Sequence, residues 1–128
     1  MQKILLSIGA MLGGLGVVLG AFGAHGLEKI ATPKQLAVYQ TGVQYQMYHA
    51  LALILVGLLT ERIANGFITS AGGLFIAGVL FFSGSLYLIT SLQTANKSVP
   101  TAVGILTPIG GLFFVAGWVC LLIGILRK

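Results

Sequence analysis

Long apolar stretches alternate with short polar connectors along this chain. The apolar stretches lie in residues 3–24, 33–60, 67–89 and 100–126, and about 20 apolar residues in a helix suffice to cross the hydrocarbon core of a bilayer. Thr32 and Pro33 form a helix start, with Thr32 as N-cap, and Asn65-Gly66 is a turn signal. The pattern therefore predicts four membrane-spanning helices over these ranges.

These helices predict an all-α fold, an integral membrane four-helix bundle with its N- and C-termini on the same side. Residues 1–128 are expected to form a single transmembrane domain. Lys3 followed by an apolar run resembles the start of a secretory signal peptide. This apolar run of about 20 residues is that of a membrane span rather than of a signal, so we expect it to be retained.

Composition excludes a water-soluble bundle. Hydrophobic residues make up 57% of the chain and charged residues 7%, which leaves too few charges to build a solvated outer face. The charged residues lie outside these ranges or within the first two residues of one, as Lys3 and Lys34 do, which is expected when charge is costly in hydrocarbon. The basic residues are scattered singly, which favours membrane lipid headgroups over nucleic acid as partners.

The distribution of positive charge predicts an orientation. One side carries slightly more lysine and arginine than the other, which favours cytoplasmic termini in a bacterial cytoplasmic membrane. The terminal side would hold Lys3, Arg62, Arg127 and Lys128, and the opposite side Lys29, Lys34 and Lys97.

Two glycine seams indicate close helix packing. Small residues that recur every three or four positions share one helix face and let two backbones approach. The first seam consists of Gly9, Gly13, Gly16, Gly20 and Gly23, and the second of Gly110, Gly117 and Gly124. The partner of each seam is either a neighbouring helix of the same chain or a second subunit, so a homo-oligomer is one expectation.

Uncharged polar residues gather where the first helix ends and the second begins. If these helices form an antiparallel hairpin, both histidines lie in the same half of the bilayer. Ionisable groups at membrane depth predict a proton relay, a solute path or a headgroup site, whereas the structural interpretation is that they hydrogen-bond helices together. We favour the structural interpretation. The cluster comprises His25, Glu28, Thr41, Gln44, Tyr45, Tyr48 and His49.

Catalytic and metal chemistry find little support. His25, Glu28 and His49 lack the close spacing of a metal site, and Cys120 lies alone in an apolar helix, where cysteine is normally inert. Trp118 lies too far from the C-terminus to be an interface anchor, and helix packing explains it better. We therefore expect no enzyme activity, no metal and no cofactor.

Three motifs carry a family resemblance: Gly20-Ala-Phe-Gly-Ala-His-Gly-Leu27, Thr41-Gly-Val-Gln-Tyr-Gln-Met-Tyr-His-Ala-Leu-Ala52, and Thr107-Pro-Ile-Gly-Gly111 followed by Gly117-Trp118. Together they resemble the membrane family called domain of unknown function 423, which includes the eukaryotic transmembrane protein 256. The resemblance spans essentially the whole chain. It implies a small four-helix membrane protein, in bacteria of the cytoplasmic membrane, and supplies no activity or catalytic residue.

Two functions from different classes follow. The favoured one is an integral membrane protein that acts through helix packing, oligomerisation or contact with lipid or protein. The alternative is a small channel or transporter for protons or a small solute, with the polar cluster around His25 and His49 along its path. The alternative requires water to reach His49.

Overall fold

A computed structural model describes residues 1–63 and 65–128, and this part of the chain is helical throughout its regular elements. Its elements are α1 (Gln2–His25), η1 (Leu27–Lys29), α2 (Pro33–Leu59), α3 (Gly66–Gly78), η2 (Val79–Ser83), α4 (Gly84–Thr94) and α5 (Thr101–Leu126). The elements α3, η2 and α4 follow one another without a break and are called the third span below. With α1, α2 and α5, they make four helices long and apolar enough to cross a membrane.

The helix ends follow local sequence signals, with one difference from the prediction. Thr32 caps α2 in a capping box with Gln35. The third span continues to Thr94, whereas the sequence predicts its end near residue 89. The hydroxyls of Thr90 and Thr94 each donate to the carbonyl four residues earlier, which lets a polar segment remain helical. The helix stops before Asn96, which adopts a left-handed conformation with φ of 56°.

The third span contains a π-helical turn at η2. The backbone N–H of Gly84 donates to the carbonyl of Val79, five residues back. Such a turn accommodates one residue more than an α-helical turn and shifts the faces of the helix that follows. The buried Ser83 lies in this turn, and its hydroxyl donates to the Gly42 carbonyl of α2.

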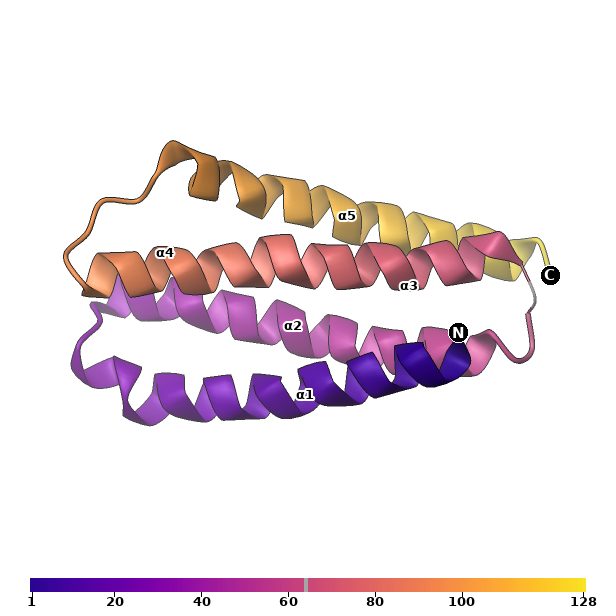
Figure 1. Ribbon diagram of the computed structural model, residues 1–128, viewed down its shortest axis with the longest axis horizontal. Coiled ribbons are helices and arrows are strands. Elements are labelled where there is room, and N and C mark those ends of the chain that lie inside the picture. Colours follow the sequence, from indigo (N-terminus) through magenta and orange to yellow (C-terminus); the bar gives the residue numbers. More distant parts are fainter. Residues whose placement is uncertain (64) are drawn as a thin grey trace.

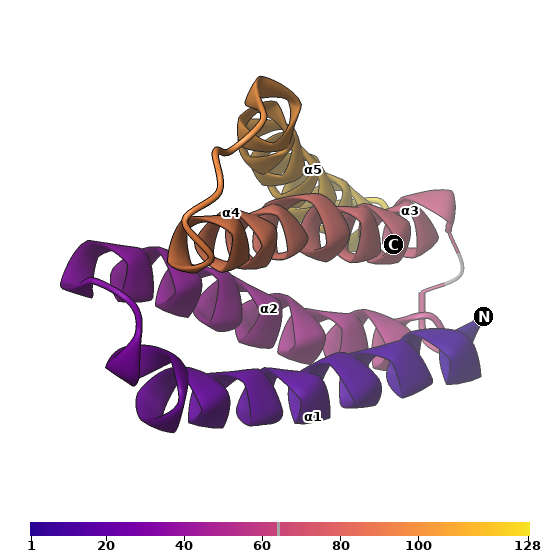
Figure 2. The ribbon, with the colours of Figure 1, turned by 60° about the vertical axis from the view of Figure 1, so that its left-hand side comes forward.

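The helices pack mainly against their neighbours in the sequence (Figures 1 and 2). The most extensive contacts join α1 with α2, and α3 with α5, while the third span also packs on α2. Both chain ends lie at the same end of the bundle, on the right in Figure 1. The opposite end holds η1 and the connection between α4 and α5.

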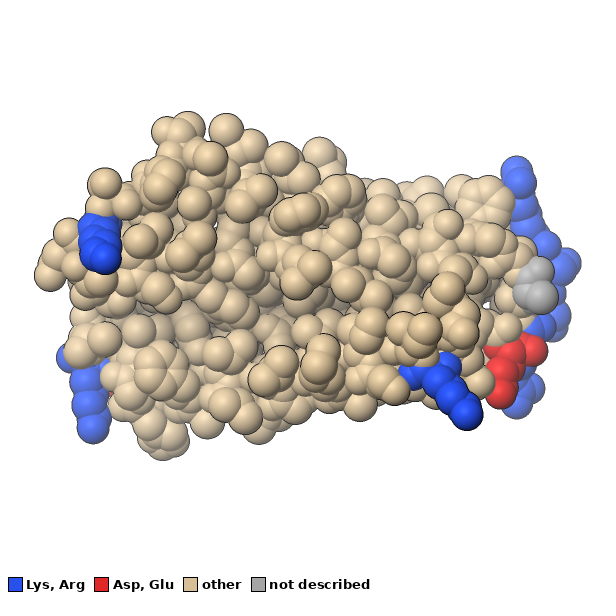
Figure 3. Space-filling view, in the orientation of Figure 1, with Lys and Arg blue, Asp and Glu red and all other residues tan. Residues whose placement is uncertain are grey.

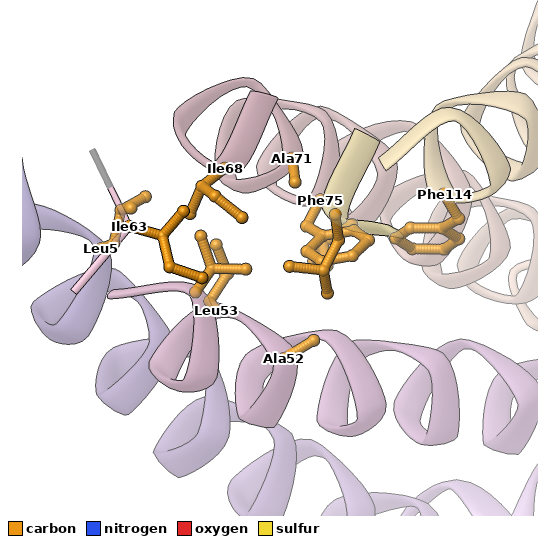
Figure 4. Packing of buried hydrophobic residues seen from close by; sticks show 11 residues of the cluster. Leu5, Ala52, Leu53, Ile63, Ile68, Ala71, Phe75 and Phe114 are labelled. Atoms are coloured by element: carbon orange, nitrogen blue, oxygen red, sulfur yellow. The ribbon is translucent and has the colours of Figure 1, made fainter. Parts of the chain in front are cut away.

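The hydrophobic core lies between α2, the third span and α5, with Leu5 added from α1 (Figure 4). Leu53, Ile68 and Phe75 are fully buried at its centre. Phe114 enters from α5 and lies beside Phe75. Since α1 and α5 bury only a small share of their residues, most of their surface faces outward.

Both glycine seams are used within the chain. On α1, Gly9 lies against Ala50 and Ile54 of α2, and the seam continues to Gly23, which lies against Tyr39. On α5, Gly117 lies against Phe75 and Gly124 against Ile68. The seams therefore account for packing inside one molecule and leave no evidence for a second subunit at these surfaces.

Charged side chains gather toward the two ends of the bundle, and the middle of the visible face carries none (Figure 3). Lys29, Lys34 and Lys97 belong to the end with η1, and Arg62 and Arg127 to the end with the termini. This separation leaves an uncharged central band, as crossing a hydrocarbon layer requires.

Candidate functional site

His49 lies inside an aromatic enclosure formed by three of the spans. Its ring stacks on Phe114 of α5 with the centroids 3.6 Å apart and the planes 8° apart. Phe75 of the third span and Trp118 of α5 contact it from other directions, at centroid distances of 5.2 and 5.9 Å. Only 3% of His49 is exposed, so the histidine is sealed by apolar contacts.

Both ring nitrogens of His49 have partners. Nδ1 lies 2.7 Å from the Tyr45 carbonyl, which can only accept, so Nδ1 donates. The indole N–H of Trp118 donates to Nε2 over 3.1 Å, so Nε2 accepts. These two bonds together require the neutral imidazole protonated at Nδ1. A second proton, on Nε2, would point at the indole N–H and would break this hydrogen bond. In the neutral form, His49 of α2 is hydrogen-bonded to Trp118 of α5 and links the two helices.

Gln46 is a second buried link, and it joins three spans. Its amide nitrogen donates to the Leu12 carbonyl of α1 over 2.8 Å, and its amide oxygen accepts from the Tyr87 hydroxyl over 2.6 Å. The residue is 3% exposed. One glutamine of α2 is thereby tied to α1 on one side and to the third span on the other.

Further hydroxyl groups complete the inward polar contacts. Tyr39 donates to the Leu19 carbonyl of α1, and Ser85 pairs with Thr107 of α5 over 2.6 Å. No buried side-chain nitrogen or oxygen among residues 1–63 and 65–128 lacks a hydrogen-bond partner. The buried side chains of this described part of the chain therefore bond to one another and to the backbone, as is usual for buried polar groups.

The opposite side of α2 presents polar groups outward. The outer face of α2 is defined by exposed residues that recur every three or four positions: Ala37, Gln40, Gln44, Tyr48, Leu51 and Leu55. Among these residues, Gln44 and Tyr48 carry the polar side chains nearest the middle of α2, and both are exposed. Tyr48 is 56% exposed, and its ring contacts the half-exposed Tyr45 at 5.7 Å.

The structure does not bring the predicted polar cluster together into one site. His25 ends α1 and Glu28 lies in η1, and both are exposed. His49 lies beyond the midpoint of α2, about 24 Å from its start at Pro33 at 1.5 Å per residue. The two histidines therefore do not lie side by side.

The other members of the cluster divide between local bonds and the surface. Thr41 donates to the Ala37 carbonyl of its own helix, and Gln44 faces outward. The Tyr45 ring packs on Phe82 at 4.8 Å. No group of three histidine, cysteine, aspartate or glutamate side chains within residues 1–63 and 65–128 is close enough to hold a metal ion.

Gln46, Tyr87 and the Trp118 N–H make inward hydrogen bonds between spans, and the predicted cluster does not include these residues. Gly42 offers the signal that separates Gln46 from Gln44. A glycine in the helix marks the side of close approach, and Gln46 follows Gly42 by one helical turn, on the same side. The bond between Trp118 and His49 joins residues 69 positions apart, and no local pattern reveals it.

Comparison with known proteins agrees with this architecture. A family model described as "Protein of unknown function (DUF423)" matches residues 19–111. The chain is 41% identical to the UPF0382 membrane protein YwdK of Bacillus subtilis, over 98% of both chains. It is also 41% identical to the UPF0382 membrane protein SH2409 of Staphylococcus haemolyticus, over 95% of this chain and 94% of the relative.

A third relative, the UPF0382 membrane protein SAB0533 of Staphylococcus aureus, is 38% identical over 95% of this chain and 94% of its own length. No solved structure matches the chain. The names of these relatives agree on a membrane location and state no activity. The family match covers the end of α1, all of α2 and the third span, and therefore includes both histidines. On this evidence the chain belongs to the DUF423 family and is a helical membrane protein.

Proposed function

We propose that this protein is a membrane-embedded interaction module, which binds another molecule along the outer face of α2. It has no catalytic role in this proposal. It lies in a bacterial cytoplasmic membrane with both termini in the cytoplasm, where Arg62, Arg127 and Lys128 meet the lipid headgroups. The outward position of Gln44 and Tyr48 is the observation that carries the proposal.

The depth of these groups makes their exposure informative. Gly23 of α1 lies against Tyr39, and Gly57 of α2 lies against Leu6. The apolar part of α1 between Leu6 and Gly23 therefore lies alongside the part of α2 between Tyr39 and Gly57. Gln44 lies five residues beyond Tyr39, about 7.5 Å further toward the middle of this apolar zone at 1.5 Å per residue.

Lipid tails offer no hydrogen-bond donor or acceptor to an amide at that depth. Moving an amide from water into hydrocarbon without a hydrogen-bond partner costs roughly 4–8 kcal/mol. The buried polar side-chain atoms of residues 1–63 and 65–128 all have partners, whereas the exposed Gln44 amide faces the surroundings. A molecule with donor and acceptor groups on this face would remove that cost, so the face favours a binding role.

The sealed position of His49 argues against the alternative, a channel or transporter for protons or a small solute. Such a path requires water at the histidine, and the ring is enclosed by Phe75, Phe114 and Trp118. Two surface pockets lie away from His49, one beside Arg127 and one beside Lys34.

Photo-crosslinking in living cells tests the proposed binding role. A photoreactive residue in place of Leu51, which is 61% exposed on the outer face of α2, is expected to form crosslinks to protein. The matched control replaces Leu112 of α5, which is 69% exposed, and should crosslink to lipid alone. Crosslinks to lipid alone at both positions would show that no protein occupies the outer face of α2.

The proposed orientation has a separate test in intact cells. In a Cys120→Ser background, Ser98→Cys is expected to react with a membrane-impermeant maleimide, since the connection between α4 and α5 would face outward. Gln2→Cys, at the end with the termini, should react only after the cells are opened. The reverse labelling pattern would place the termini outside.

A further inference from the structure

We infer that the molecule bound on the outer face of α2 is a second copy of this chain, paired through Gln44. This inference rests on the proposed function and names its partner. A glutamine amide carries both donors and an acceptor, so two identical glutamines can satisfy each other. A two-fold axis perpendicular to the membrane would bring the α2 helices together in parallel, with each Gln44 facing its own counterpart.

Gln44 sits at the right depth for such a pair. At the depth derived from the packing of α1 on α2, water would not compete for the amide, and Lys34, the charged residue of α2, lies about 15 Å away along the helix at 1.5 Å per residue. Two amides that meet there form two hydrogen bonds across the axis and specify the register of the pair. Gln40, one turn nearer the end with η1, and Tyr48, one turn deeper, extend the polar surface on both sides.

The adjoining surface of α1 permits a close approach. Small residues are exposed there at three- and four-residue spacing, and a Cβ added at Gly14 would meet no atom within 4 Å. The small exposed residues of α1 are Ser7, Ala10, Gly14, Ala21 and Ala24. These small residues would let two copies approach each other closely, while Gln44 would supply the hydrogen bonds between them.

The small exposed residues of α1 and the side-chain amides of Gln40 and Gln44 face the same side of the molecule. On α1, Leu5, Ile8 and Leu12 lie on one side of the glycine seam and pack on the core. The small exposed residues lie on the other side of the seam. On α2, Gly42 faces the third span, against Tyr87, and Gln44 lies away from it. Both surfaces are therefore turned away from the third span, on one side of the α1 and α2 pair.

Energy transfer between labelled copies of the full-length chain tests this inference. Lys128→Cys in the Cys120→Ser background carries the donor or acceptor dye, and the purified protein is reconstituted in phosphatidylethanolamine and phosphatidylglycerol vesicles. Dilution with lipid gives the dissociation constant. We expect a dimer, and Gln44→Leu should weaken it about tenfold, as the loss of interhelical hydrogen bonds in a membrane does.

The matched control is Gln93→Leu, which makes the same chemical change at an exposed residue near the end of α4. It should leave the dissociation constant unchanged. At a dilution where all three proteins are monomeric, thermal unfolding should be the same, because both glutamines are exposed. Transfer no greater than random proximity in the unmodified chain, or equal affinity with and without Gln44, would overturn the inference.

Failure of this inference is distinguishable from failure of the proposed function. If the purified chain is monomeric while Leu51 crosslinks to a different protein in cells, the second copy is excluded and the binding role stands. If the chain is monomeric and Leu51 reaches only lipid, both proposals fail. Crosslinks of Leu51 to another copy, together with loss of the dimer on Gln44→Leu, support both.

Discussion

Replacing Gly110 by alanine is expected to destabilise the folded bundle by about 2–3 kcal/mol, the upper part of the range of about 1–3 kcal/mol that is typical of overpacking. A Cβ at Gly110 would lie 2.7 Å from both Cα and Cβ of Phe82. The nearest atoms belong to the backbone of η2, where a side-chain rotation cannot relieve the clash. Denaturant titration in detergent, followed by circular dichroism, measures the loss.

The neighbouring glycine supplies the matched control for this substitution. A Cβ at Gly111 would meet its nearest atom, Cδ2 of Phe82, at an ordinary contact distance of 3.9 Å. Gly111→Ala should therefore be neutral, or more stable by up to about 1 kcal/mol from helix propensity. Equal stability of Gly110→Ala and Gly111→Ala would show that α5 does not pack on η2 as described.

His49→Ala is expected to cost about 3 kcal/mol of unfolding free energy, in the range of large-to-small core substitutions. The change removes the ring stacked on Phe114 and leaves the Trp118 N–H without its acceptor. The same titration measures it. Trp118 fluorescence should change as well, because the indole then loses its neighbour.

His49→Phe separates packing from hydrogen bonding at the same position. Phenylalanine keeps an aromatic ring against Phe114 and removes only the two hydrogen bonds, so the expected loss is about 1 kcal/mol. A structural histidine thus predicts a larger loss for alanine than for phenylalanine. No loss of stability in either variant would contradict the enclosure of His49.

The sequence predicts the helices well because their signals are local. The start of α2 at Pro33 follows from Thr32 and Pro33, and the structure shows the capping box there. The end of the third span differs because hydroxyls that look like loop residues bond back to their own helix, as at Thr94. Polarity alone does not distinguish a loop from a helix whose polar side chains satisfy themselves.

The candidate site was harder to predict because it depends on which side of α2 faces inward. Gln44 and Gln46 are two residues apart, and they differ only in facing away from or toward the other helices. The sequence pattern assigns Gln44 to the cluster and does not assign Gln46. The spacing of the α1 glycines predicts that they pack closely against a helix. Only the tertiary structure shows that this helix is α2.

Trp118 illustrates the same limit. Its position in the sequence favours helix packing, which agrees with its contacts to Phe75 and His49. The hydrogen bond it donates to His49 depends on α2 and α5 meeting side by side. A polar residue in a membrane helix can therefore be recognised from sequence as a structural or functional candidate, while its partner requires the fold.

Proton flux across reconstituted vesicles tests the central claim most directly: the buried polar residues hold the helices together, and no path runs through His49. Vesicles with a pH gradient and an internal pH-sensitive dye are prepared with the unmodified protein, with His49→Phe, and without protein. The account predicts the same slow leak in all three. Rapid flux with the unmodified protein that His49→Phe abolishes, in vesicles where both proteins are folded, would contradict it.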